Sequence, residues 1–140
     1  MKTDEFIEDR IRWRAREHGF PKQSTHFWAN VKNAPQIHLP KELGKPILVS
    51  SSSEADLIVL CTRGAVVKSN GQETRFSYED IEEIRDAPIT EDEDKADLSR
   101  LVIKLSSGNE IFVSPEPYGP AFSIWNILIM LQRLHWPGET

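Results

Sequence analysis

Short apolar runs alternate with polar residues between positions 47 and 114, a pattern typical of antiparallel β-strands. A longer apolar segment with helical periodicity follows, from about residue 120 to 135. Pro120 suits a first helical position, and Pro137-Gly138 ends the run. The pattern therefore predicts one C-terminal helix after seven strands, near residues 47–50, 57–62, 64–69, 73–77, 81–86, 99–105 and 110–114.

Local features indicate how the strands connect. Asn70-Gly71 predicts a two-residue type I′ hairpin, because both residue types accept the positive φ that this turn requires. Ile81 and Ile84 lie three residues apart, which breaks strict alternation and predicts a bulge or a tight bend. Ser50–Ser53 is polar throughout and is predicted to be a loop.

The C-terminal helix has an unusually wide apolar arc, and Ser123, Asn126 and Arg133 form a narrow polar strip. One sheet buries roughly a third to a half of a helix circumference. We therefore expect this helix to be covered on more than one side, by the N-terminal arm or by a second copy of the chain. The arm is the favoured cover because it supplies several large apolar residues. Trp125 is predicted to be buried between the helix and the strands.

The N-terminal residues 4–18 predict a further helix, with Thr3 as its N-cap and Gly19 as its stop. Ile7 and Ile11 share one face, and arginines interrupt the rest of the apolar stripe. Two interpretations remain open. The helix either packs on the surface through these isoleucines, with arginine stems lying over apolar surface, or it binds a partner.

Residues 20–46 form an arm that connects this helix to the strands. Phe27–Val31 predicts either a short helix or a strand. We expect one compact domain in two parts, the arm at 1–46 and the strands with the C-terminal helix at 47–140. Four prolines rule out a long regular element in the arm: Pro21, Pro35, Pro40 and Pro46.

The net charge of −5 hides an asymmetry along the chain. Residues 1–46 carry nine Lys/Arg against six Asp/Glu, whereas residues 47–140 carry eight against sixteen. Ten of those acids lie within residues 79–97, which contain only two basic residues. An acidic body repels phosphate backbones and anionic lipids. The composition therefore argues against nucleic acid as a partner and makes a membrane partner less favoured.

The expected compartment is the cytoplasm. The N-terminus has no apolar signal core, and the longest apolar run, Ile127–Leu131, is far too short to span a membrane. The single cysteine, Cys61, excludes an intrachain disulfide. It lies within an apolar strand run, so we interpret it as a buried structural thiol.

No residue pattern indicates catalysis. The four histidines at 18, 26, 38 and 135 are scattered and lack the spacing of metal ligands. The run Glu91–Asp94 is contiguous and lacks the spaced ligands of a calcium loop, which favours a solvated acidic loop. We therefore predict no catalytic, metal-binding or cofactor-binding residues and no cofactor.

Two stretches carry a resemblance to a known family. Val59–Val67 reads Val-Leu-Cys-Thr-Arg-Gly-Ala-Val-Val, and Tyr78–Ile84 reads Tyr-Glu-Asp-Ile-Glu-Glu-Ile. Over about residues 47–135 the chain resembles bacterial pleckstrin-homology (PH)-like and GRAM-like domains. The resemblance implies an α+β fold, a partly open seven-stranded antiparallel barrel plugged at one end by the C-terminal helix, with the N-terminal helical arm outside it.

The resemblance implies no single function, because PH-like barrels bind many ligands. Phosphoinositide-binding members carry basic residues in the loop between their first two strands, whereas residues 50–56 are polar and acidic here. We expect a non-enzymatic binding or adaptor module with a protein partner, as a monomer or homodimer. The alternatives are a lipid-surface module and a toxin-neutralising protein. The candidate partner contacts are Trp13, Phe27, Trp28 and Arg63.

Overall fold

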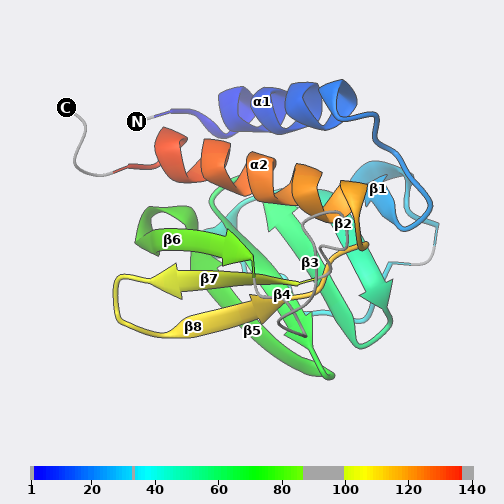
Figure 1. The fold of residues 1–140 in the computed structure, drawn as a ribbon. Coiled ribbons are helices and arrows are strands. Elements are labelled where there is room, and N and C mark those ends of the chain that lie inside the picture. Colours follow the sequence, from blue (N-terminus) through cyan, green and yellow to red (C-terminus); the bar gives the residue numbers. More distant parts are fainter. Residues whose placement is uncertain (1, 33, 87–99, 137–140) are drawn as a thin grey trace.

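The computed structural model describes residues 2–32, 34–86 and 100–136. In these residues the chain forms two helices, eight strands and three short 3₁₀ turns (Figure 1). The helices are α1 (Asp4–Glu17) and α2 (Gly119–Leu134). The strands are β1 (Thr25–Phe27), β2 (Pro46–Ser53), β3 (Asp56–Cys61), β4 (Gly64–Ser69), β5 (Gln72–Ser77), β6 (Ile81–Asp86), β7 (Leu101–Leu105) and β8 (Glu110–Val113).

The strands form two antiparallel sheets, one in the order β1-β2-β3-β4-β5 and one in the order β6-β7-β8. The seven predicted strands correspond to β2–β8, and they divide four and three between the sheets. The eighth strand, β1, comes from the arm and pairs with β2. Residues 27–31 are expected to form a short helix or a strand, and they form part of each. Phe27 ends β1, and a 3₁₀ turn spans Trp28–Asn30. The α+β class is confirmed.

The predicted turn chemistry is confirmed at two places. Asn70 has φ 51° and Gly71 has φ 82°, so both residues of the β4–β5 hairpin adopt the positive φ expected of them. The pairing of β6 with β7 shifts register between Ile81 and Glu83, which is the irregularity predicted from the spacing of Ile81 and Ile84.

The prediction of a loop at Ser50–Ser53 is wrong, because β2 continues to Ser53 and pairs with β3. Ser50 is fully buried, and its hydroxyl lies 2.7 Å from Thr25 Oγ1 on β1. The same hydroxyl accepts a hydrogen bond from the backbone N–H of Glu116 at 2.9 Å. Partners from distant parts of the chain satisfy this serine, so a polar run is compatible with a central strand.

The main core lies between the sheets and the two helices. α1 and α2 lie side by side over the sheets, and α2 also contacts β6 (Figure 1). The buried side chains of α1 are Ile7, Ile11 and Ala15, all in the same core cluster as Ile124 and Leu128 of α2. The expectation that the N-terminal arm covers α2 is therefore confirmed.

A second core covers the opposite face of the five-stranded sheet. Along β3, Ile58 and Leu60 belong to the main core, whereas Val59 and Cys61 belong to the second cluster. Side chains alternate between faces along a strand, so β3 is buried on both sides. Arm residues pack on the second face: Trp28, Val31, Ile37, Leu39 and Leu43. The arm thus covers the sheet as well as α2.

Trp125 departs from its predicted full burial. It is only partly buried and packs at the edge of the main core. Its ring meets the exposed Phe122 edge-to-face, with 6.0 Å between centroids. Phe122 and Trp125 therefore make part of the uncovered surface of α2 apolar.

Candidate interaction face on the helix pair

The outward side of α1 combines aromatic, basic and acidic residues, since the exposed Asp9 and Glu17 lie one turn before and after Trp13. Thr3 caps the helix by accepting a hydrogen bond from the Phe6 N–H at 3.1 Å. Because Ile7 and Ile11 face the core, the helical period places Phe6 and Trp13 in solvent. Trp13 is 47% exposed, and the guanidinium groups of Arg10 and Arg14 lie 5.0 and 5.5 Å from its ring.

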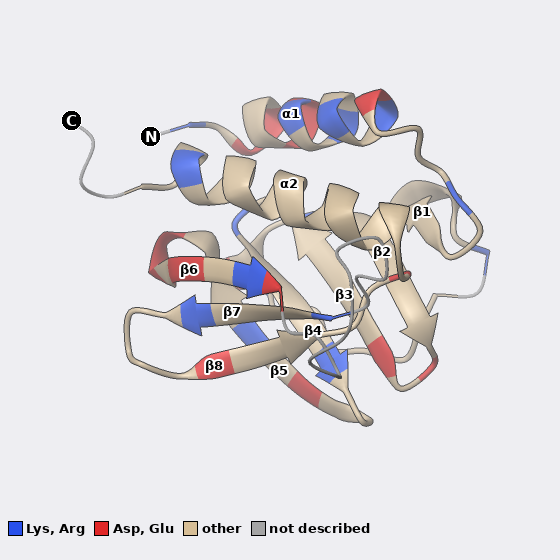
Figure 2. Ribbon diagram, in the orientation of Figure 1, with Lys and Arg blue, Asp and Glu red and all other residues tan. Residues whose placement is uncertain are grey.

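The outward side of α2 is mainly apolar, includes the polar Asn126, and carries no negative charge. Phe122 is 49% exposed, Ile129 is partly exposed, and Arg133 is exposed one turn further on. The helix contains no Asp or Glu, and Figure 2 shows it uncharged except near its C-terminal end. Arg14 of α1 lines the same surface hollow as Ile129 and Arg133, so the outward sides of the two helices adjoin.

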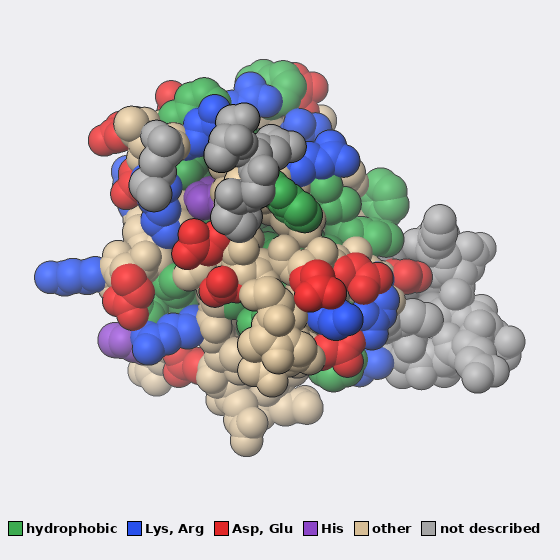
Figure 3. All heavy atoms as spheres, turned by 90° about the vertical axis from the view of Figure 1, so that its left-hand side faces the viewer, with side chains coloured by type: hydrophobic (Ala, Val, Ile, Leu, Met, Phe, Trp, Pro, Cys, Tyr) green, Lys and Arg blue, Asp and Glu red, His purple; other side chains and the backbone are tan. Residues whose placement is uncertain are grey.

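We call this surface the helix-pair face. In Figure 3, hydrophobic and basic side chains gather in the upper part of the molecule with some acidic ones among them, and most of the acidic side chains in view lie lower. The face is defined by residues of both helices: Phe6, Arg10, Trp13, Arg14, Phe122, Ile129 and Arg133.

An open hollow of about 1010 Å³ extends from this face to the end where α1 begins and α2 ends. Arg63 lines it and is held in place by an ion pair to Asp4 at 2.6 Å and a hydrogen bond to the Lys2 carbonyl at 2.8 Å. Glu42 and Glu79 also line it, so both signs of charge are present.

The titratable groups near this hollow have structural roles. Burial lowers the pKa of His135, whose Nδ1 donates to the Leu131 carbonyl at 2.8 Å and whose ring packs on Tyr78 at 5.2 Å. Burial raises the pKa of Tyr78, and its hydroxyl donates to the Cys61 carbonyl at 2.6 Å. Burial also raises the pKa of the Cys61 thiol to about 12, so the reactive thiolate is disfavoured.

The four predicted contact residues do not form one site. Trp13 lies on the helix-pair face, and Arg63 lies in the adjoining hollow. Phe27 is only 6% exposed, because it packs in the main core with the guanidinium groups of Arg12 and Arg16 over its ring. Phe27 is therefore a core residue and is not accessible to a partner.

Trp28 is partly buried in the second cluster, on the opposite face of the sheet from α1. Sequence reasoning did not select Phe122, Ile129 or Arg14 as contacts. Phe122 and Ile129 could have been found from the sequence, because they lie seven residues apart on one side of the helix. The apolar arc of that helix is too wide for one packed sheet to cover.

Among the described residues, no group of three or more His, Cys, Asp or Glu side chains is placed to hold a metal ion. Within the same residues, neither helix has the length and apolar character needed to cross a bilayer. A scan against protein-family models gave no match, and neither did a search of curated proteins.

Proposed function

We propose that this protein is a non-enzymatic binding module that contacts a partner protein through the helix-pair face. One observation carries the proposal: Trp13 is exposed between two arginines on α1, and α1 packs beside α2, which contains no acidic residue. Tryptophan and arginine are enriched among the residues that dominate binding energy at protein interfaces.

The chemistry of the face specifies the kind of partner. Phe122 and Ile129 offer apolar contact, and the arginines at positions 10, 14 and 133 supply positive charge around it. Asp9 and Glu17 of α1 add two exposed negative charges near Trp13. The matching surface is an acidic amphipathic segment whose apolar side chains meet α2 and whose carboxylates meet the arginines. An anionic membrane is the competing ligand, and the acidic remainder of the chain disfavours it.

The fold is proposed to be PH-like. The division of β2–β8 into four and three strands, followed directly by α2, supports this assignment. So does the packing of α2 against the core between the two sheets. PH-like folds serve as binding scaffolds for many ligands, so the assignment is compatible with an adaptor role and does not specify the partner.

A capture experiment with matched variants tests the proposal. The full chain, Trp13→Ala and Phe112→Ala are immobilised and exposed to native lysate. Phe112 is the control because its exposed fraction, 44%, is similar to the 47% of Trp13, whereas it lies on β8 and not on the helices. We expect one protein to be retained by the wild type and by Phe112→Ala and lost with Trp13→Ala. The purified partner should then bind the wild type directly, and Arg14→Glu should weaken that binding.

Two results would contradict the proposal. Equal capture by the wild type and by Trp13→Ala would show that the helix-pair face is not the contact surface. Flotation of the full chain with phosphatidylserine vesicles, abolished by Trp13→Ala, would identify a membrane as the ligand of this face. Neutral phosphatidylcholine vesicles are the control for the charge dependence.

A further inference from the structure

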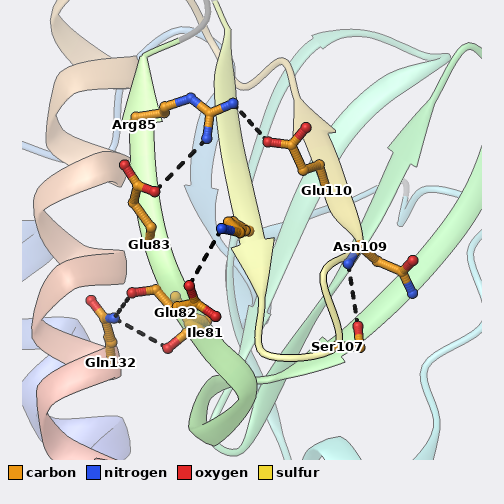
Figure 4. A network of polar contacts seen from close by, with 9 residues as sticks. Ile81, Glu82, Glu83, Arg85, Ser107, Asn109, Glu110 and Gln132 are labelled. Carbon is orange, nitrogen blue, oxygen red and sulfur yellow. Dashed lines mark hydrogen bonds and ion pairs between the residues drawn. The ribbon is translucent and has the colours of Figure 1, made fainter.

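The two sheets have four strand edges, and they differ in how they are protected. β1 is only three residues long and β8 only four, so each offers few backbone groups. The first two residues of the β6 edge are capped by the Gln132 side chain, which donates to the carbonyls of Ile81 at 3.2 Å and Glu82 at 3.1 Å (Figure 4). The same strand is also interrupted by a register shift between Ile81 and Glu83. Short strands and covered edges are the usual protection against unwanted pairing.

β5 is the exception. It is six residues long and pairs with β4 in continuous register, without a bulge. It is the last strand of its sheet, and the residues from Gln72 to Arg75 are all exposed. A hollow of about 580 Å³ lies on the inner face of this strand, lined by Gln72 and Thr74 on one side and by Ile111 and Phe112 of β8 on the other. The side chains on the inner face of the β5 edge therefore have room towards β8.

We propose that β5 pairs with β5 of a second copy of this chain to form a homodimer with a continuous sheet. The inference is independent of the helix-pair face, which lies on the helices. The sequence of the strand specifies the partner, since Glu73 and Arg75 flank Thr74 with opposite charges. A two-fold axis at Thr74 places each Glu73 directly opposite the Arg75 of the other copy, in an antiparallel pair.

The charges also exclude neighbouring registers. Centring the axis on Glu73 would oppose two glutamates, and centring it on Arg75 would oppose two arginines. Like charges directly opposite one another destabilise a strand pair, whereas opposite charges stabilise it. Thr74 pairs with the core-facing Val67 of β4, so Glu73 and Arg75 both point to the other face and meet their counterparts there.

Both charged residues have contacts within the monomer. Glu73 accepts a hydrogen bond from the His38 N–H at 2.8 Å, and Arg75 lies 3.6 Å from Glu42 in an exposed ion pair. Exposed ion pairs contribute little to stability. These contacts hold arm residues on the outer face, and no strand of the described residues pairs with the outer edge of β5.

Disulfide trapping tests the register directly. At the proposed axis, Thr74→Cys places two thiols opposite one another, within the range that a disulfide spans. Gln72→Cys is the matched control, because its two thiols would lie four residues apart along the strands, about 13 Å. The native Cys61 is buried and does not compete. We expect rapid covalent dimer formation by Thr74→Cys and little by Gln72→Cys.

Sedimentation tests the interaction itself. The wild type should show a concentration-dependent monomer–dimer equilibrium. Thr74→Lys opposes two ammonium groups at the axis and should raise the dissociation constant roughly tenfold or more. Arg75→Glu should weaken the dimer similarly, and combining it with Glu73→Arg should restore it. Because these side chains are exposed, melting curves close to wild type are expected and serve as the folding control.

Three results would overturn the proposal. The first is a wild type that sediments as a monomer at every soluble concentration. The second is equal trapping by Gln72→Cys and Thr74→Cys. The third is a dimer that survives Thr74→Lys and is lost with Phe122→Ser, which would place the interface on the helix-pair face instead. The first two results leave the proposed binding of a partner protein untouched.

Discussion

At the scale of single residues, Gly64 and Gly71 are required for two different reasons, steric crowding at Gly64 and a positive φ at Gly71. A Cβ on Gly64 would overlap the Phe76 carbonyl oxygen and the Leu43 side chain, whereas a Cβ on Gly71 would meet nothing within 4 Å. Gly71 instead has φ 82°, which a β-branched residue resists. We expect Gly71→Val to cost about 1–2 kcal/mol of unfolding free energy.

Gly64→Ala should cost more, about 3 kcal/mol, because it forces backbone apart in a packed sheet. Urea denaturation of both variants measures the difference. An unchanged midpoint for Gly71→Val would mean that the positive φ of the hairpin imposes no cost. A smaller loss for Gly64→Ala than for Gly71→Val would contradict the crowding.

His135 makes stability depend on pH. Its pKa is lowered from the usual 6.5, mainly by burial, although Glu79 opposes part of the effect and Arg63 adds to it. The unfolded chain therefore binds a proton at a higher pH than the folded chain does. By linkage, the free energy of unfolding falls as the pH drops below about 6.5 towards the folded pKa.

Replacing His135 with Gln removes this titration. Denaturation at pH 7 and at pH 5 should show a smaller loss of stability for His135→Gln than for the wild type. His18 also has a pKa lowered by burial, and it remains in both proteins, so the comparison isolates His135. Equal losses in the two proteins would show that His135 does not contribute.

At the scale of elements, Gln132 joins α2 to the outer edge of β6. Its amide makes two hydrogen bonds to strand carbonyls (Figure 4). Gln132→Leu keeps the apolar bulk and removes both bonds, so we expect a loss of about 1 kcal/mol and faster hydrogen exchange in β6. Arg85→Ala breaks the exposed contact to Glu110 on β8 and should cost less. A larger loss for Arg85→Ala would contradict the role assigned to Gln132.

The elements were predictable where their signals are local. The Asn70-Gly71 hairpin, the irregularity after Ile81 and both helices follow from turn chemistry, spacing and capping. The missed features depend on distant partners. Ser50 can lie in a strand because Thr25 and Glu116 form hydrogen bonds with its hydroxyl. These partners are distant in sequence, so no local pattern near Ser50 predicts them. The accessible residues of the helix-pair face likewise follow only from which sides of the helices are covered.

At the scale of the whole molecule, the arm is part of the core rather than an appendage. Its helix covers α2, its strand extends the larger sheet, and its later residues cover that sheet's outer face. The polar cluster of Thr25, Ser50 and Glu116 fastens the arm to the segment that enters α2. The arm's net positive charge is thereby fixed on an otherwise acidic body.

The last prediction isolates the helical cover. Deleting residues 1–46 would remove β1 and the outer cover together with α1, so deletion of residues 1–18 is the sharper experiment. It removes Ile7, Ile11 and Ala15, all fully buried, and uncovers the side of α2 that they pack against. Large exposed apolar patches promote association between chains. We expect the shortened chain to bind a hydrophobic dye and to aggregate.

The deletion is made in the Thr74→Lys background, which weakens the proposed association through β5. Any aggregation that is then observed reports on the uncovered surface of α2. The matched control is the full chain with Phe6→Ser and Trp13→Ser, which loses exposed aromatic rings without uncovering the core. This control should stay free of dye and denature close to the wild-type midpoint. A shortened chain that remains a dye-free monomer would show that α2 is stable with the sheets alone, and α1 would then be available as a detachable binding element.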